Sequence, residues 1–448
     1  MSATPAQTGP ESSAASGRSA RLLTLVSTLL LLVGLTWFAV RMSPPVWTGG
    51  LLAVLTGFVL LVASVAGALA ARLGLPRLTG FVVMGIVAGP SVLGILSRGA
   101  VERLHLIDEF ALVLIALLAG GELKLATLRP RAATIGATTL AVTGVVALGT
   151  TAAVVLMAPL LPFLAGLSLA GRIGVGLLLG VWAANSSPDL TVAVIEETGA
   201  RGALADVILG TTIVKDVLVI VLFTLTLSLV SPLVGAASGG FDAHILVELA
   251  REVGGAVLVG ALLGWIFSLY LQAGDGERPP LATFLFGYVL VVVADRFGVE
   301  LLLAGVTAGF VIENLSPAGD RMIRGVQSVS VVLFAFFFTL AGSSLDLAAV
   351  RTVWAGALLL FGVRVFLTWA GTRLGTRLSD ASEAVRAKCW RGLVSQGGVT
   401  LGLLLLVERG LPEVGEEILN LGMSVVLGGI LVGPVLLQSA LSTEEGDG

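Results

Sequence analysis

The stretch WAANSSPDLT, residues 182–191, lies inside a long apolar run and is a poor continuous helix. Pro188 lacks an amide hydrogen and clashes with the preceding turn, and the polar residues before it, Asn185, Ser186 and Ser187, compete for backbone hydrogen bonds. Backbone groups freed at membrane depth are tolerated only where protein or a water-filled cavity satisfies them. The stretch therefore predicts an interrupted membrane helix.

A second interruption is expected at VSQGGVT, residues 394–400. Gln396 is followed there by the pair Gly397 and Gly398, and glycine weakens a helix interior. Two interrupted helices at matching positions of inverted halves point to a transport site at the membrane midplane. The alternative is that Ser-Pro and Gly-Gly are ordinary kinks of membrane helices.

The composition places the chain in a membrane. Of 448 residues, 56% are hydrophobic and 12% charged, whereas about a quarter of a soluble domain is charged. The net charge of −3 gives no basic surplus for nucleic acid. One cysteine, Cys389, and two histidines argue against disulfide frameworks and Cys or His metal sites. No catalytic triad, metal-ligand spacing or phosphate loop is present, so we expect neither an enzyme nor a cofactor.

A membrane helix needs about 20 mainly apolar residues. We expect an all-α membrane protein with about fourteen spans, near 21–40, 47–71, 79–97, 110–128, 132–158, 172–195, 203–230, 243–271, 281–296, 300–316, 326–346, 350–373, 388–407 and 415–440. With both termini in the cytoplasm, most of the 26 basic residues fall on the inner side, as the positive-inside rule requires.

The position of the two interruptions divides the chain into repeats. The predicted organisation is a disordered tail (1–20), an extra N-terminal helix (21–46), a first six-helix repeat (47–232), a linker helix (243–272), an inverted second six-helix repeat (281–440) and a short tail (441–448). Each interruption then falls in the fifth helix of its repeat, and the single linker span inverts the second repeat relative to the first.

Charged residues inside spans are the next signal. Lys215 and Asp216 lie near the middle of the span 203–230, and Arg364 lies inside the span 350–373. A charge at the centre of a membrane helix costs roughly 2.5–3.5 kcal/mol on insertion scales and is a functional candidate by default. The alternative is a structural ion pair between Asp216 and Arg364.

Several stretches together resemble the monovalent cation:proton antiporter superfamily over nearly the whole chain from about residue 50. They are GLPRLTGF (74–81), GIVAGPSVLG (85–94), LLAGGELKL (117–125), NSSPD (185–189), VIEETG (194–199) and SQGG (395–398). The resemblance implies an inverted-repeat fold, crossing interrupted helices, a six-helix core that moves against the rest, and a homodimer.

The resemblance also implies roles for individual residues. Asp216 takes the place of the ion-binding acid, Arg364 that of the basic residue before the second interruption, and Ser186 and Ser187 those of polar residues near the ion. Lys215 departs from the pattern, because the family usually has Asp, Asn or Gln there. Asp189 and Asn185 are further candidates for the ion and proton site, with Asp189 able to supply a second negative charge. Glu122 is a candidate for an ion funnel at the cytoplasmic end of its span.

These observations predict a secondary transporter of a bacterial inner membrane that exchanges Na⁺ or K⁺ for protons, with the two ions competing for Asp216. Basic clusters at 373–377 and 386–391 are expected to face anionic lipid. Two alternatives stay open. One is a non-transporting sensor or scaffold in which Lys215 has replaced a ligand. The other is a symporter of a small organic anion that binds Lys215 and Arg364.

Overall fold

The structure, a computed structural model, describes residues 23–37, 48–230, 233–234, 243–273, 279–316, 319–343, 345, 347–411 and 413–442. The expected tail at 1–20 lies outside the described residues, as does nearly all of the tail at 441–448. Throughout the described ranges the chain is helical and forms no strand, which confirms the predicted fold class.

The apolar helix Leu23–Trp37 comes first. The elements that follow are α2 (Thr48–Arg72), α3 (Arg77–Ala88), α4 (Arg98–Gly121), α5 (Leu125–Leu128), η1 (Arg129–Arg131), α6 (Ala132–Leu156), η2 (Ala158–Leu160), η3 (Pro162–Leu164), α7 (Leu169–Ala183), α8 (Pro188–Thr198), α9 (Ala203–Val230), α10 (Ala243–Ala273), α11 (Pro279–Phe297), α12 (Leu301–Leu315), α13 (Gly319–Gln327), α14 (Ser330–Ser343), α15 (Leu347–Arg377), α16 (Glu383–Gly392), α17 (Gly398–Gly410) and α18 (Gly415–Leu441).

Seven helical stretches of the described ranges are long and apolar enough to cross a membrane, and six shorter helices are also apolar. The chain is therefore an integral membrane protein. The count of fourteen spans stays a prediction, since several of the expected spans are short or divided helices. For example, the span expected at 326–346 is the shorter helix α14, and the separate helix α13 precedes it.

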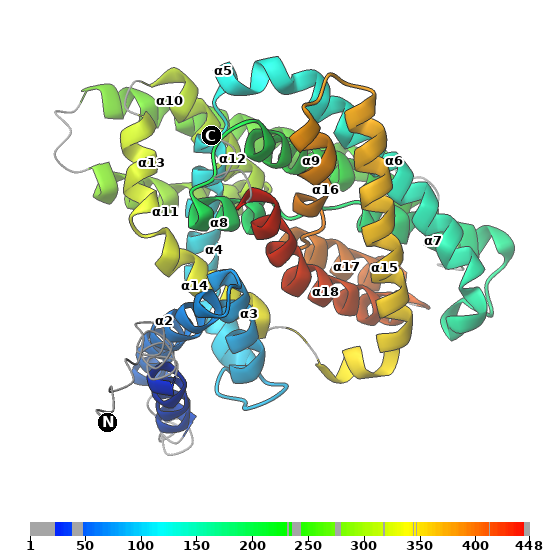
Figure 1. The fold of residues 1–448 in the computed structure, drawn as a ribbon, viewed down its shortest axis with the longest axis horizontal. Coiled ribbons are helices and arrows are strands. Elements are labelled where there is room, and N and C mark those ends of the chain that lie inside the picture. Colours follow the sequence, from blue (N-terminus) through cyan, green and yellow to red (C-terminus); the bar gives the residue numbers. More distant parts are fainter. Residues whose placement is uncertain are drawn as a thin grey trace, which may run out of the picture.

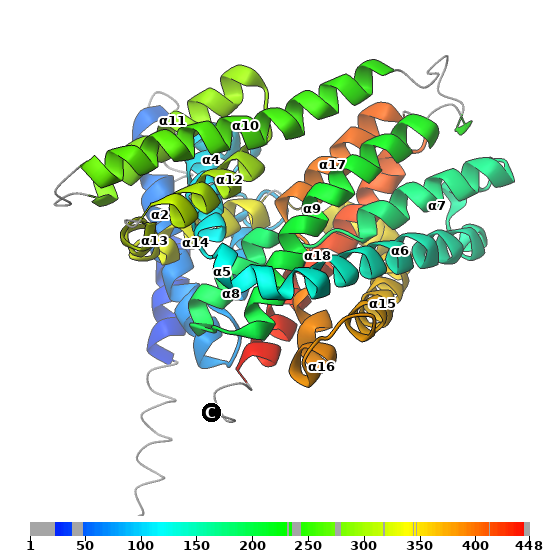
Figure 2. The ribbon, with the colours of Figure 1, turned by 90° about the horizontal axis from the view of Figure 1, so that it is seen from above.

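The helices form two groups, visible in Figures 1 and 2. In the first, which we call the crossing group, α6 packs against α7, α9 and α15, and α18 packs against α15, α16 and α17. In the second, the flanking group, α12 packs against α4 and α10, and α3 packs against α2 and α14. The half-helix α8 follows α7 in the chain, and we count it with the crossing group. It contacts α9 of that group and also α4 of the flanking group.

The sequence of α6 shows how a span is placed between protein and lipid. Val142, Val146 and Val154 are buried, whereas Leu140, Leu148 and Leu156 are 67–80% exposed on the other face. Residues that are four or eight positions apart lie on nearly the same face of a helix, so the three valines line one face and the three leucines another. The buried face meets α15, where Gly371 lets the backbones of the two helices approach closely at Val142.

Candidate functional site

Both predicted interruptions are present, and the two broken helices cross at them. The first break separates α7 from α8 at residues 184–187, and the second separates α16 from α17 at residues 393–397. The Ser187 amide donates to the Ser395 carbonyl over 3.0 Å, and the Ser186 hydroxyl donates to the Leu393 carbonyl over 3.0 Å. Each break thus satisfies backbone groups that the other has freed, as the bilayer interior requires.

Thr400, in the first turn of α17, adds a second link between the broken helices. Its carbonyl accepts the indole N–H of the buried Trp182 over 3.0 Å, and its hydroxyl accepts the Asn185 amide over 3.3 Å. The Asn185 Oδ1 in turn accepts the backbone N–H of Ser186 over 2.9 Å. Asn185 is therefore held from both sides in one orientation.

The Arg364 guanidinium binds backbone carbonyls of both breaks. Its Nε donates to the Ala183 carbonyl over 2.8 Å, its Nη2 to the Asn185 carbonyl over 2.8 Å, and its Nη1 to the Val394 carbonyl over 2.6 Å. These carbonyls lie at or just beyond the C-terminal ends of α7 and α16, where helix dipoles place partial negative charge. A fully buried cation is thereby neutralised by two helix ends at once.

This arrangement differs from the ion pair considered above. In the part of the chain that the structure describes, no ion pair joins Arg364 to Asp216. The preference of a planar guanidinium for several fixed acceptors explains the difference, because three carbonyls freed by the breaks lie around it.

The N-terminal end of α8, where the helix dipole is positive, has an acidic residue beside it. Asp189 lies in the first turn of α8, is 4% exposed, and accepts a short hydrogen bond from the Ser187 hydroxyl. The Ser187 oxygen also accepts the N–H of Leu190 over 3.2 Å and so caps α8. A carboxylate at a helix N-terminus is stabilised by the dipole.

Glycine is required where the breaks approach each other. A Cβ at Gly397 would overlap the Ser187 hydroxyl and lie 3.1 Å from Asp189 Oδ2, and a Cβ at Gly433 of α18 would lie 2.6 Å from the Cα of Ser395. Gly397 therefore serves close packing as well as helix interruption. The side chain of Gln396 is fully buried, and no described residue gives its amide a hydrogen-bond partner.

Asp216 and Lys215 lie on α9 beside the crossing. Asp216 is 5% exposed and Lys215 is 0% exposed. Around these residues α9 packs against α8, α16 and α17. Among the described residues, neither Asp216 Oδ1 nor Lys215 Nζ has a hydrogen-bond partner. One buried oxygen of the Asp216 carboxylate thus has no protein donor among the described residues.

Glu122 lies away from the crossing, at the far end of α8. Its carboxylate accepts Nη1 of Arg201 over 3.0 Å and Nε2 of Gln327 over 3.1 Å. Gln327 also donates to Glu196 of α8 over 3.2 Å. A cavity of about 460 Å³ is lined by Glu122, Arg201 and Gln327 together with Lys124, Arg131 and Asp206. Glu122 therefore lines a polar cavity, and its funnel role stays a prediction.

Comparison with known proteins decides the family. A model described as sodium/hydrogen exchanger, transmembrane, matches residues 59–442. The chain belongs to this family. Its membership confirms the resemblance drawn from the sequence motifs, and it confirms that the exchanger is a transport protein rather than an enzyme.

Relatives and solved structures agree with this assignment. The exchanger is 23% identical over 358 residues to the Na(+)/H(+)-K(+) antiporter GerN of Bacillus cereus, covering 77% of this chain and 84% of that one. It is 21% identical over 353 residues to the probable Na(+)/H(+) antiporter GerT of the same organism, covering 77% and 87%. Among solved structures, the sodium proton antiporter MjNhaP1 from Methanocaldococcus jannaschii superposes with a TM-score of 0.70 at 17% identity, covering 91% of this chain and 99% of that one. At this identity the match supports the fold alone.

Sequence reasoning located the breaks and the buried charges but missed several of their partners. In the exchanger, Trp182 begins the first interrupted stretch and Thr400 ends the second. Their closeness to the breaks could therefore be predicted from the sequence, but the hydrogen bond between them could not. Gln327 was also missed, and Glu196 and Glu197 were noted only as part of the stretch VIEETG, with no contact assigned to them. A local sequence gives no signal for contacts that join residues more than a hundred positions apart.

Proposed function

We propose that this exchanger moves a monovalent cation, Na⁺ or K⁺, against protons, and that the two compete for Asp216. The observation that carries the proposal is the Asp216 carboxylate itself. It is almost completely buried on α9, beside two crossing broken helices, in a chain of the sodium/hydrogen exchanger family. Within the described residues its Oδ1 has no hydrogen-bond donor, which leaves that oxygen available to an ion or a proton.

The cation and the proton compete because both bind the same two carboxylate oxygens of Asp216. Hard monovalent cations prefer oxygen ligands, and the ionised carboxylate offers two. Ser186 can add its hydroxyl oxygen, because its hydrogen is directed to the Leu393 carbonyl and its lone pairs are turned elsewhere. Protonation of Asp216 removes the negative charge and expels the cation. Cation and proton therefore exclude each other, and alternating access turns that exclusion into exchange.

Lys215 sets the stoichiometry in this proposal. If its ammonium stays charged through the cycle, Asp216 exchanges one cation for one proton and transport is electroneutral. If Lys215 releases its proton when the cation binds, two protons move per cation and transport depends on membrane potential. Flux measured in proteoliposomes at imposed potentials separates the two cases.

The moving part in this proposal is the crossing group. It contains both broken helices, Asp216 and Arg364, and we propose that it shifts against the flanking group so that Asp216 faces each side in turn. We further propose a homodimer in a bacterial inner membrane, with both termini cytoplasmic, the predicted division into two inverted repeats, and the basic clusters at 373–377 and 386–391 facing anionic lipid.

Reconstitution of Asp216→Asn tests the proposal. The purified chain is placed in liposomes containing a pH dye, and Na⁺, K⁺ and Li⁺ are added separately. The parent protein is expected to dissipate a pH gradient with at least one cation, and Asp216→Asn to lose this activity. Asp206→Asn is the matched control, since it removes a carboxylate from the same helix, where Asp206 pairs with Arg131 at 3.1 Å away from the crossing. Full cation-coupled flux in Asp216→Asn would remove the proposed site.

The same assay addresses the alternatives. A folded protein that moves no proton with any of the three cations would support the sensor or scaffold hypothesis. The anion symporter hypothesis loses a binding group, because three guanidinium nitrogens of Arg364 already donate to carbonyls. Protection from thermal unfolding by organic anions but not by cations would nevertheless favour it.

A further inference from the structure

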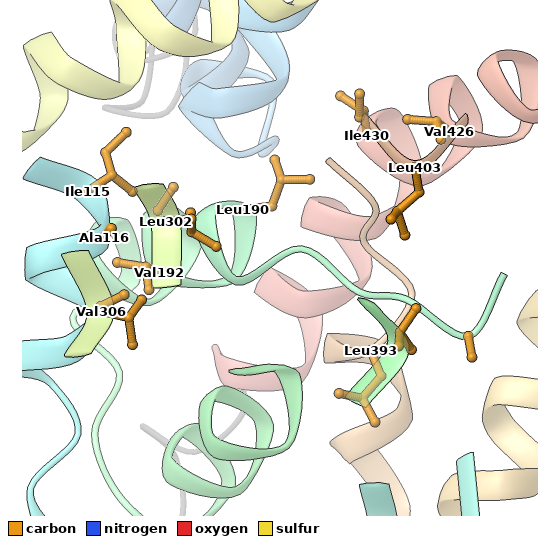
Figure 3. Packing of buried hydrophobic residues seen from close by; sticks show 14 of the residues in the cluster. Ile115, Ala116, Leu190, Val192, Leu302, Val306, Leu393, Leu403, Val426 and Ile430 are labelled. Carbon is orange, nitrogen blue, oxygen red and sulfur yellow. The ribbon is translucent and has the colours of Figure 1, made fainter. Parts of the chain in front are cut away.

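The half-helix α8 packs against the flanking group. Figure 3 shows Val192 of α8 beside Ala116 of α4 and Val306 of α12, and the three residues belong to one packed core. Glu196 follows Val192 by four positions, so it lies on the same face of α8, one turn closer to the end of the helix. The end of α8 thus carries a carboxylate toward the flanking group.

Glu196 meets a second carboxylate there, that of Glu122, which directly follows α4. A single nitrogen, Nε2 of Gln327, donates to Oε1 of Glu122 over 3.1 Å and to Oε1 of Glu196 over 3.2 Å. Nη1 of Arg201 lies 3.0 Å from Oε2 of Glu122 and 3.9 Å from Oε1 of Glu196. Because both carboxylates reach the same two nitrogens, they form a close pair that joins α8 to the flanking group.

This pair has little positive charge and little water around it. The side chains of Glu122 and Glu196 are 15% and 10% exposed, whereas that of Arg201 is 57% exposed. Among the described residues, Arg201 is the one basic residue that pairs with either carboxylate. Like charges this close disfavour the doubly ionised state. One proton removes the surplus negative charge, because a protonated carboxyl group can donate to the other carboxylate.

The other charged groups around the pair are matched with one another or face water. Arg324 of α13 is exposed and lines the neighbouring cavity. Lys215 and Asp216 lie more than two turns beyond Asp206 on α9. The residues of α14 and α18 that line the neighbouring cavities are uncharged. The matched ion pairs are Lys124 with Glu313 of α12 at 3.1 Å, Arg131 of η1 with Asp206 of α9 at 3.1 Å, and Arg77 of α3 with Glu197 of α8 at 4.0 Å.

The pair also lies between two cavities. Glu122 and Gln327 line the cavity of about 460 Å³, and Glu196 lines another of about 310 Å³ between α2, α3, α8 and α14. Both cavities are large enough to hold water molecules. A proton can therefore reach the pair through water, although the two side chains themselves are mostly buried.

We propose that Glu122 and Glu196 together bind one proton, at a site distinct from Asp216, and that this proton latches α8 to the flanking group. In the latched state one carboxyl group donates to the other, and Gln327 donates to both. When water takes up the proton, two like charges remain, and their repulsion favours withdrawal of α8 from α4 and α13. A rise in pH thus frees the crossing group to move. The effect on rate rests on the proposed exchange, whereas binding of the proton does not.

Infrared difference spectroscopy of the purified protein tests the shared proton. A protonated carboxyl group has a carbonyl stretching band that disappears when the group ionises. We expect a titrating band in the parent that both Glu122→Gln and Glu196→Gln lack, because a carboxylate without its like-charged neighbour stays ionised. Asp206→Asn, which removes another acid of the same cavity, and Asp216→Asn should both retain the band. A band that persists in either glutamine variant overturns the shared proton.

The exchange rate tests the latch. At a saturating cation concentration, competition at Asp216 no longer limits the rate, so the maximal rate reports the release of α8. We expect this rate to rise several-fold with pH in the parent. Glu196→Gln keeps a donor to Glu122 at every pH, so its maximal rate should stay at the low-pH level of the parent, within about twofold. Glu197→Gln is the matched control, since Glu197 accepts the Arg77 N–H instead. A rise in Glu196→Gln equal to that of the parent overturns the latch.

The two measurements separate failure of this proposal from failure of the proposed function. If the parent exchanges no cation at any pH, the exchange proposal fails, and the infrared band alone decides whether the pair binds a proton. If the titrating band is absent from Asp216→Asn and present in both glutamine variants, the proposal for Glu122 and Glu196 fails, while exchange at Asp216 stands on its own assay.

Discussion

The two ends of the half-helix α8 are held in opposite ways. Its N-terminal end lies in the crossing, where backbone groups of one break bond to the other and Arg364 binds three buried carbonyls. Its C-terminal end is held by side chains: Glu197 accepts the Arg77 N–H with both oxygens at 2.8 Å, and Glu196 accepts Gln327 over 3.2 Å. The first end is joined within the crossing group, and the second is joined to the flanking group.

The difference has an energetic meaning. A buried carbonyl that loses its donor costs roughly 1–3 kcal/mol, because no water replaces the donor. At the C-terminal end, Glu197 also pairs with Arg77 at 4.0 Å and Glu196 with Arg201 at 3.9 Å, and both basic side chains are more than half exposed. Such ion pairs contribute about 0–1 kcal/mol each, since water and salt replace them. The C-terminal end of α8 also adjoins cavities of about 310, 380 and 460 Å³. We therefore expect the crossing to move as a unit and the contacts of Glu196 and Glu197 to be those that break.

The largest expected effect is that of Arg364→Met. This change leaves the carbonyls of Ala183, Asn185 and Val394 without their donor in a dry site, so the cost should reach about 3–5 kcal/mol. Thermal unfolding in detergent, followed by size-exclusion chromatography, measures it. Arg373→Met on the same helix is the control, since Arg373 is exposed and lies 5.2 Å above the Trp369 ring. Equal stability of the two variants would contradict the role given to Arg364.

Gly397→Ala should come second. The added methyl group would overlap the Ser187 hydroxyl, and overpacking of this kind typically costs about 1–3 kcal/mol. Gly402→Ala is the matched control in α17, because a Cβ there meets nothing within 4 Å, and alanine in a helix interior is favoured over glycine by about 0.5–1 kcal/mol. The two substitutions are thus expected to shift the unfolding temperature in opposite directions. A stabilising Gly397→Ala would show that the breaks are not closely packed.

Thr400→Val should have a smaller effect on stability, about 1 kcal/mol. The substitution keeps the carbonyl that binds Trp182 and removes only the hydroxyl that accepts Asn185. Because the Asn185–Thr400 bond joins the two breaks, against which α9 with Asp216 packs, cation affinity should also fall by a few-fold. Thr400→Ser should restore it, and Thr372→Val, which removes a buried hydroxyl bonded within its own helix over 2.7 Å, should not alter it. Loss of affinity in Thr372→Val as well would point to a general loosening.

The crossing was more predictable from sequence than the C-terminal end of α8, for a physical reason. Pro188, the two serines before it (Ser186 and Ser187) and Gly397 disfavour a helix by local chemistry, which a sequence displays directly. The partners of Arg364 were not predictable, because a guanidinium selects among acceptors that only the fold brings together.

Arg201→Gln should have the smallest effect and tests the other side of the comparison. Arg201 is 57% exposed along its side chain and pairs with Glu122 at 3.0 Å and with Glu196 at 3.9 Å. Its removal should lower stability by about 1 kcal/mol or less at low salt, and by nothing measurable at high salt, because exposed pairs are screened. Arg324→Gln is the control: Arg324 lines the same cavity and forms none of the ion pairs found in the described ranges. If α8 must leave these contacts during transport, Arg201→Gln should change the exchange rate more than it changes stability, and a variant with a lower unfolding temperature but an unaltered rate would place the moving boundary elsewhere.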